Sequence, residues 1–164
     1  MDSFEREIVE LLPRLRRFGR VLARVPADAD DLVQATVERA LARRGQWRLG
    51  TRLDSWMFRI MKNAWIDESR ARSRSSRLFA PEEAGEAVGD AGAAAMEARL
   101  AAREVENAMA KLPQDQKVAL ALVLVEGLSY QEAADVLEIP AGTLTSRLVR
   151  GRAALLAELA EAAP

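Results

Sequence analysis

The side chains in this sequence that can do chemistry are carboxylates, hydroxyls, amides and guanidinium groups, because the chain contains no histidine and no cysteine. Imidazole bases, catalytic thiols, disulfides and thiolate metal sites are therefore excluded. The acidic cluster Asp28, Asp30 and Asp31 could hold a cation, but its place at the start of a predicted helix fits helix capping better. Without a nucleophile–base pair, we expect no enzyme, no metal or cofactor site and no small-molecule substrate.

The clearest recognition chemistry lies near the end of the chain, in SYQEAADVLEIPAGTLTSRLVRGR (Ser129–Arg152). A capping box, Ser129-x-x-Glu132, predicts the start of one short helix, and a second helix is expected over about 141–160 after a turn at EIP. The side of the second helix opposite its leucine stripe carries Thr143, Ser146, Arg147 and Arg150. Arginine can reach guanine or phosphate, so the pair is typical of a helix-turn-helix that enters the major groove. The alternative is an ordinary αα-hairpin with polar outer residues.

A second candidate nucleic-acid surface lies on the helix predicted from about Thr51 to Arg74, which a Thr51-x-x-Asp54 box would cap. Its apolar stripe comprises Leu53, Trp56, Met57, Ile60, Met61 and Ala64. Its other face carries Ser55, Arg59, Lys62, Asn63, Ile66 and Arg70. Arginine binds phosphate and asparagine can pair with a base edge, so this face could hold nucleic acid. Trp65 and the loop residue Trp47 could stack on bases, whereas the stripe position of Trp56 indicates the core.

The N-terminal part predicts two helical segments. The first covers about 4–25, with Pro13 placed where a new helix could begin. The second covers about 28–44, and one of its sides carries Asp31, Gln34, Glu38 and Leu41. A charged side normally faces solvent, but an exposed leucine beside the charges favours a protein-docking face.

Apolar residues recur at helical spacing over nearly the whole chain, which predicts an all-α fold. The stretch 75–95 is rich in Ala, Gly and Glu, so we expect a flexible linker between two small domains, residues 1–74 and 96–164. Residues 1–78 carry 17 Lys/Arg against 11 Asp/Glu, and residues 79–164 carry 7 against 14. Such an asymmetry suggests an electrostatic partner for one half. Each domain is near the size at which a lone core is marginal, which favours mutual docking or a partner.

The cellular compartment is indicated by what the sequence lacks. The longest apolar run, VALALVLV at Val118–Val125, is too short to span a bilayer. The N-terminus is acidic early and has no apolar core of a signal peptide. Together with the absence of cysteine, these features favour the cytoplasm.

Three blocks of the sequence, in this order, resemble the bacterial RNA polymerase sigma factors of the extracytoplasmic-function (ECF) group, the minimal sigma-70 type. They are DADDLVQATVERAL (28–41), LDSWMFRIMKNAWIDESRARSR (53–74) and LPQDQKVALALVLVEGLSYQEAADVLEIPAGTLTSRLVRGRAAL (112–155). The resemblance covers about residues 8–77 and 96–160. It implies that the factor makes no bond itself but binds core RNA polymerase, docks its second domain at the −35 promoter element and opens DNA at −10.

The resemblance also implies roles for individual residues. The first block looks like the helix that grips the clamp of the polymerase largest subunit, so Asp31, Gln34 and Glu38 would face polymerase. In the second block, Asn63 would hold a flipped −10 base, and the phosphate-binding cations would be Arg59, Lys62 and Arg70. In the third block, the −35 readers would be Thr145, Ser146, Arg147 and Arg150. Many relatives carry Arg or Lys where this chain has Thr145, which removes a cation and a phosphate contact.

Two other functions compete with this interpretation. A sigma-like decoy would bind an anti-sigma factor and never engage a promoter, but this chain has no room for the receiver domain that usually accompanies a decoy. A stand-alone helix-turn-helix repressor would bind promoters without polymerase, and it leaves Asp31, Gln34 and Glu38 unexplained. The family is usually held inactive by an anti-sigma factor, so we expect such a partner beside core polymerase and promoter DNA.

Overall fold

A computed structural model of the chain describes residues 1–75 and 92–163. Over those ranges the structure is helical without strands, so the predicted all-α class is confirmed. The helices are α1 (Ser3–Leu22), α2 (Pro26–Ala42), η1 (Arg44–Gln46), α3 (Leu53–Ser75), α4 (Ala93–Ala110), α5 (Gln114–Leu120), η2 (Ala121–Val125), α6 (Tyr130–Leu137) and α7 (Ala141–Ala162). Most of the predicted linker, residues 76–91, lies outside the described residues.

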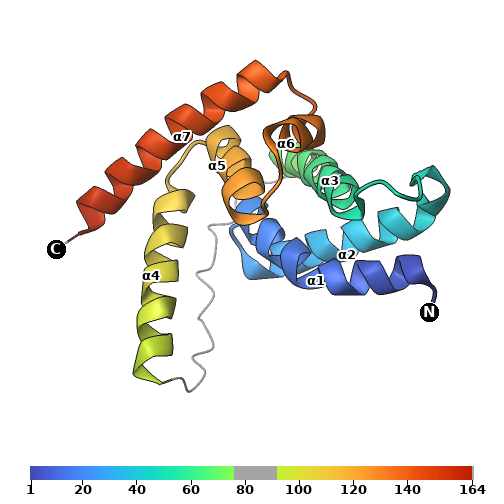
Figure 1. The fold of residues 1–164 in the computed structure, drawn as a ribbon, viewed down its shortest axis with the longest axis horizontal. Coiled ribbons are helices and arrows are strands. Elements are labelled where there is room, and N and C mark those ends of the chain that lie inside the picture. The colour runs from blue at the N-terminus through green and yellow to red at the C-terminus, as the bar shows by residue number, and fades with distance from the viewer. Residues whose placement is uncertain (76–91, 164) are drawn as a thin grey trace.

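Helices α1, α2 and α3 pack against one another around an aromatic and aliphatic core (Figure 1). The rings of Phe18 and Phe58 meet edge to face at 5.1 Å, and both side chains are fully buried. Met57 and Met61 of α3 and Leu32 of α2 are likewise fully buried. Apolar residues at helical spacing give each of the three helices one apolar side. The helices pack together because this buries all three apolar sides.

Two expected helix starts are wrong. Helix α1 continues through Pro13, because the proline removes only one hydrogen bond, to the carbonyl of Val9, and both residues are exposed to water. Helix α3 begins at Leu53 rather than with a cap at Thr51. The Thr51 hydroxyl instead donates a 2.6 Å hydrogen bond to the carbonyl of Arg48, and the expected box partner, Asp54, accepts hydrogen bonds from arginines.

Helices α4 to α7 form a second group, in which α7 packs against α4, α5 and α6. Leu144 and Leu148 of α7 are buried, as their stripe predicts. Gly151 allows α7 to lie close to α5, because an added Cβ would stand 3.0 Å from Cδ1 of Leu120. At its end α5 widens into the single π turn η2, where the Glu126 amide donates to the Ala121 carbonyl at 2.9 Å.

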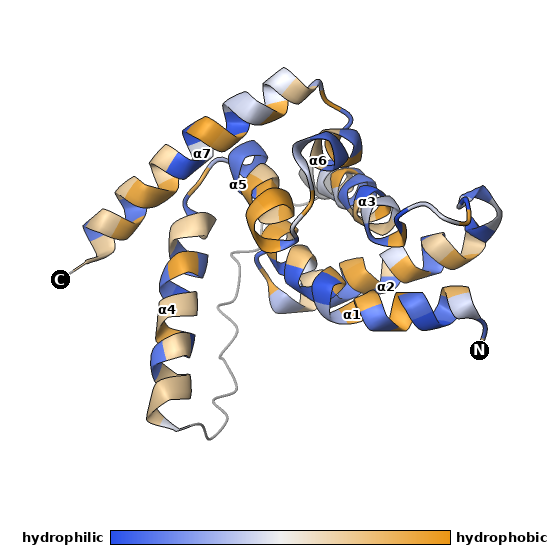
Figure 2. Ribbon diagram, viewed as in Figure 1, coloured by the Kyte–Doolittle hydropathy of each residue, from blue (hydrophilic) through white to orange (hydrophobic). Residues whose placement is uncertain are grey.

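The two groups of helices lie against each other. Helices α5 and α6 are placed over α1 and α3, whereas α4 and the end of α7 extend away from that contact (Figure 1). The apolar side of α5 lies in the middle of the molecule (Figure 2). The arrangement leaves most of α4 exposed and sets α6 directly on α3.

Candidate nucleic-acid interface

The predicted helix-turn-helix consists of α6, a short turn and α7. The Ser129 hydroxyl accepts from the Glu132 amide at 3.1 Å, and the Glu132 carboxylate accepts from the Ser129 amide at 2.8 Å, which confirms the predicted capping box. Helix α6 ends at Glu138, which adopts the left-handed conformation with φ 57° and ψ 45°. Pro140 lies directly before the first turn of α7, and its fixed φ is compatible with the start of a helix.

The predicted −35 readers lie on the first half of α7. Thr145, Ser146 and Arg150 are exposed, while Thr143 and Arg147 are half-buried. The Thr145 hydroxyl donates to the Ala141 carbonyl at 3.0 Å, so in this rotamer it can accept a hydrogen bond from a base but has no proton to give. Arg147 lies beside Asp115 of α5, with 3.7 Å between its Nε and the carboxylate. This face is open enough to meet a DNA groove.

The predicted −10 residues share one side of α3. Lys62, Asn63 and Arg70 follow Arg59 by three, four and eleven residues, spacings that lie along one side of a helix. Arg59 and Arg70 are exposed and Asn63 is half-buried. Lys62, expected on an open polar face, is only 9% exposed, because α6 lies over this part of α3. The structure therefore brings the four residues together but covers one of the cations.

Two arginines near this face, Arg48 and Arg52, were not assigned from the sequence. A cavity of about 430 Å³ lies between the 46–52 loop, the start of α3 and α6, and its cationic lining consists of Arg48, Arg52 and Arg59. Trp47 and Ser55 also line it, and the indole N–H of Trp47 and the hydroxyl of Ser55 are buried without a hydrogen-bond partner among the described residues. The bracketing glycines of the loop GQWRLG were the available signal, since they mark a loop of unusual conformation; Gly50 has φ +89°.

Trp47, which was expected to stack on bases, instead packs against the core beside Trp56, which was expected there. Trp47 packs on the ring of Phe4, with centroids 5.4 Å apart, and Trp56 packs on the same ring at 6.3 Å. Both tryptophans are half-buried and belong to the core of the first group. Trp65 is also half-buried.

The predicted polymerase-binding residues lie together on the outer side of α2. Asp31, Gln34, Glu38 and Leu41 are all exposed. The Gln34 side chain donates to Glu38 at 3.4 Å, so the polar groups are already oriented along one line. Leu41 is 44% exposed, which leaves an apolar contact at the end of this line.

A buried carboxylate, Glu126, joins the two groups of helices. Its side chain is 1% exposed and accepts hydrogen bonds from Arg14 at 3.0 Å and from Arg17 at 2.8 Å, both on α1. Arg14 also donates to the Glu126 carbonyl and to Asp54. We call this cluster, Arg14, Arg17, Asp54 and Glu126, the Glu126 clasp. Burial raises the pKa of Asp54, but hydrogen bonds from Arg52 and Arg14 outweigh burial and hold that pKa below its ordinary value.

Comparison with known proteins identifies the family of this chain. Residues 8–62 match the family described as the Sigma2 domain of PhyR, and residues 102–155 match Sigma-70, region 4. The chain is 37% identical over 158 residues to the ECF RNA polymerase sigma factor EcfG of Rhodopseudomonas palustris, covering 96% of this chain and 86% of that protein. The chain belongs to the ECF RNA polymerase sigma factors. The sigma factor is also 34% identical over 142 residues to SigM of Mycobacterium tuberculosis, covering 87% and 69% of the two chains.

Solved structures resemble the sigma factor over nearly its whole length. The sigma factor RpoE of Bartonella quintana, solved in complex with the anti-sigma factor NepR, matches with a TM-score of 0.81 and 29% identity over 97% of this chain and 98% of that one. CnrH, solved with the cytosolic domain of CnrY, matches with a TM-score of 0.66 and 26% identity over 97% and 91%. Within residues 1–75 and 92–163, no helix of the sigma factor is both apolar and long enough to cross a membrane.

Proposed function

We propose that this sigma factor binds core RNA polymerase, recognises the −35 and −10 elements of its promoters and helps to open the DNA at −10. The observation that carries the proposal is the identity of 37% to a relative named as an ECF sigma factor, over 96% of this chain. The open polar side of α7 and the cations of α3 supply the two DNA contacts that such a factor needs. Polymerase does the chemistry, so the factor itself is not an enzyme, and it acts in the cytoplasm.

The division of labour among residues follows from where they lie. Asp31, Gln34, Glu38 and Leu41 form the polymerase-binding surface, because they combine aligned polar groups with an exposed leucine. Thr143, Thr145, Ser146, Arg147 and Arg150 read the −35 element in the major groove. Arg59, Lys62 and Arg70 bind −10 phosphates, and Asn63 holds a base flipped from the stack. Residues 1–74 and 96–164 act as the two domains of the factor.

The test of this proposal is in vitro transcription with purified core polymerase and fragmented genomic DNA, followed by mapping of the transcript starts. We expect transcripts whose starts share −35 and −10 elements, and their absence would contradict the proposal. A double change, Asp31→Arg with Glu38→Arg, should abolish co-elution with core polymerase. Glu7→Arg with Glu10→Arg makes the same charge change on the exposed side of α1 and serves as the control.

An anti-sigma factor is the second partner that we propose. The sigma factor RpoE is described in complex with an anti-sigma factor, and CnrH is described in complex with the cytosolic domain of CnrY. A small protein of this kind would compete with core polymerase for the surface of α2. Addition of such a protein should therefore reduce co-elution of the wild type with polymerase.

The match of residues 8–62 to the Sigma2 domain of PhyR favours a second candidate function, a sigma-like decoy that binds an anti-sigma factor and no promoter. The two candidates differ in one measurement. Permanganate footprinting of polymerase on a mapped promoter detects unpaired thymines if this chain opens DNA, and a decoy leaves every thymine protected.

A further inference from the structure

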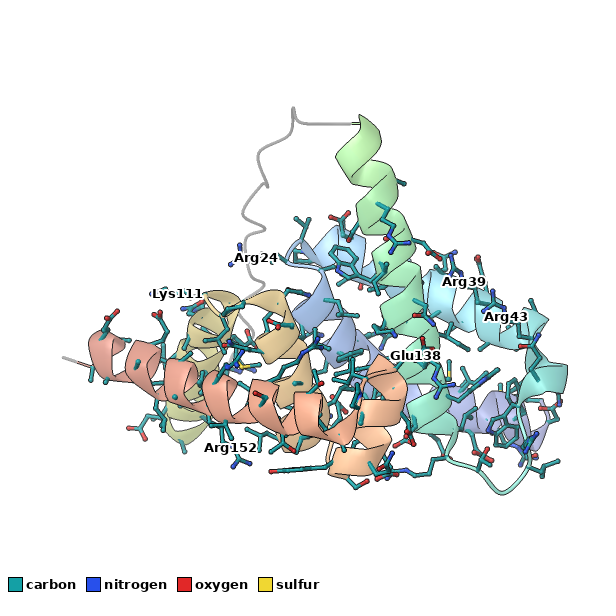
Figure 3. All side chains as sticks on the ribbon, turned by 90° about the horizontal axis from the view of Figure 1, so that it is seen from above. Arg24, Arg39, Arg43, Lys111, Glu138 and Arg152 are labelled. Atoms are coloured by element: carbon teal, nitrogen blue, oxygen red, sulfur yellow. The ribbon has the colours of Figure 1, made fainter. Side chains whose placement is uncertain are left out.

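Arg59, one of the cations of α3 proposed to bind −10 phosphates, already lies beside a carboxylate at the end of α6. We call Glu132, Asp135 and Glu138 the acidic edge of α6; they are spaced by three residues and so lie along one side of the helix. Arg52 at the start of α3 forms an ion pair with Glu132. Arg59 donates a 3.0 Å hydrogen bond to the Asp135 carbonyl, and its Nε lies 3.8 Å from the Glu138 carboxylate. The end of α6 that carries Glu138 lies over α3 (Figure 3).

Glu138 holds its position at a conformational cost. Among the described residues it alone, apart from glycines, has positive φ, and helices that end in this conformation usually carry glycine there. A Cβ is unfavourable in the left-handed region by about 1 kcal/mol or more. A residue held in such a conformation at the cationic side of α3 is the kind of outlier from which a functional role is inferred.

Lys62 shows the effect of this contact on the cations beneath. It is 9% exposed although its ammonium is charged at neutral pH. Burial lowers the pKa of Lys62, and the nearby Glu138 carboxylate offsets part of that change. The lysine is therefore shielded from solvent, and from DNA, by α6.

We infer that this sigma factor has a closed state in which the Glu132 and Glu138 carboxylates hold Arg52 and Arg59 of α3 in place of promoter phosphates, so the −10 face binds DNA only after α6 leaves it. The inference rests on the proposed function. Carboxylates and phosphates compete for the same guanidinium and ammonium groups, so both cannot be bound at once. The exposed ion pairs are individually weak. The buried Glu126 clasp joins the same two groups of helices, so a partner such as polymerase has to break that contact as well.

The first experiment measures the closed state without DNA or polymerase. Because the chain contains no cysteine, Ala42→Cys on α2 and Ala157→Cys on α7 can carry a pair of spin labels for distance measurement by pulsed electron paramagnetic resonance. In this background Glu132→Gln with Glu138→Gln should increase the long-distance population by about two- to five-fold per lost ion pair. Glu104→Gln with Glu161→Gln removes the same charge at exposed positions of α4 and α7 and should leave the distances unchanged. Equal distance distributions in the two variants would overturn the inference.

The second experiment asks whether opening exposes the −10 face. Binding of a fluorescent single strand carrying the mapped −10 sequence, measured by anisotropy, should strengthen by about two- to five-fold in Glu132→Gln with Glu138→Gln, while binding of the −35 duplex stays the same. An opened variant with unchanged single-strand affinity would also overturn the inference. The distance measurement needs no polymerase, so it tests the closed state even if the proposed function is wrong. If no variant yields transcripts with polymerase, the proposed function is contradicted and the closed state is still tested by the distances.

Two substitutions at Glu138 separate charge from backbone strain. Glu138→Gln keeps the strained conformation without the charge, and Glu138→Gly removes both. Both should open the contact, but only Glu138→Gly should also raise the melting temperature. A loss of melting temperature in Glu138→Gln without any change in distances would show a purely local structural role and would contradict the closed state.

Discussion

Helices α3 and α7 both carry cations that we propose bind DNA, but the cations of α7 are open to solvent and those of α3 are partly covered. The polar side of α7 faces solvent, and the ion pair between Arg147 and Asp115 is long at 3.7 Å. The matching side of α3 lies under α6, which buries Lys62 and binds Arg59. In this arrangement the factor can meet a −35 duplex while its −10 face is covered.

The difference follows from the kind of DNA that each helix has to meet. Duplex DNA at −35 is available before any strand separation, so an open α7 can find it early. The −10 face is proposed to act on a flipped base, which exists only once the duplex is disturbed. An uncovered cationic α3 would bind any single strand or polyanion, because phosphate contacts carry no sequence information. Covering α3 until polymerase is bound therefore restricts its use to the promoter.

The largest effect is expected on the open helix. Arg147→Ala with Arg150→Ala should weaken binding of the −35 duplex by about 1–3 kcal/mol for each arginine, because each loses a contact to a base or phosphate. Arg152 is exposed on the same helix, and because it follows Arg147 by five residues and Arg150 by two, it lies on another side of α7. Arg152→Ala is therefore the matched control. Anisotropy titrations with duplex DNA measure both. The loss should be equal with and without Glu132→Gln and Glu138→Gln, and a dependence on those changes would mean that α7 is covered too.

The Glu126 clasp should have the next largest effect, on stability. Glu126→Gln removes the charge that Arg14 and Arg17 share, and we expect the free energy of unfolding to fall by about 1–3 kcal/mol. The value lies below that of a fully buried pair, because both arginines are partly exposed. Urea denaturation followed by circular dichroism measures the change. Asp115→Asn removes an exposed carboxylate from α5 and is the control; an equal loss in both variants would show that the clasp adds nothing.

Replacing Lys62 should have a smaller effect, raising the stability of the protein while slowing promoter opening. Lys62→Met removes a charge that burial disfavours, so the closed protein should gain about 0.5–1 kcal/mol of unfolding free energy. The same change removes a phosphate contact and should slow open-complex formation in a permanganate time course. Arg59→Met, at an exposed position on the same side of α3, should slow opening without the gain in stability. A loss of stability in Lys62→Met would contradict the burial argument.

The helix-turn-helix was predictable because its signals are local. The capping box at Ser129 and Glu132, the turn and the leucine spacing of α7 each act within a few residues, and each is found in the structure. The open side of α7 follows from the same spacing. Local rules also misled where a neighbour in space decides the outcome: Thr51 resembles a cap, but α3 begins at Leu53 and Asp54 binds arginines instead.

The cover over α3 could not be predicted from the sequence. Its contacts join residues far apart in the chain, such as Arg59 with Asp135 and Arg14 with Glu126. A glutamate before a glycine, as at Glu126, normally lies in solvent, and nothing local marks it as 1% exposed. Lys62 looked exposed for the same reason, because helical spacing reports one helix and not what packs on its polar side.

The smallest expected effect concerns the cation that α7 lacks. Thr145→Arg restores an arginine at an exposed position of the −35 side, where it can reach a phosphate. Because each phosphate contact releases counterions, the slope of log affinity against log salt should become steeper by about one. Thr145→Val removes only the hydroxyl, whose proton already goes to the Ala141 carbonyl, and should leave the slope unchanged. Titrations of the −35 duplex at several salt concentrations compare the two. If Thr145→Arg leaves the slope unaltered, the side chain at position 145 does not reach a phosphate. The DNA-contacting surface of α7 would then include fewer residues than are exposed on its polar side.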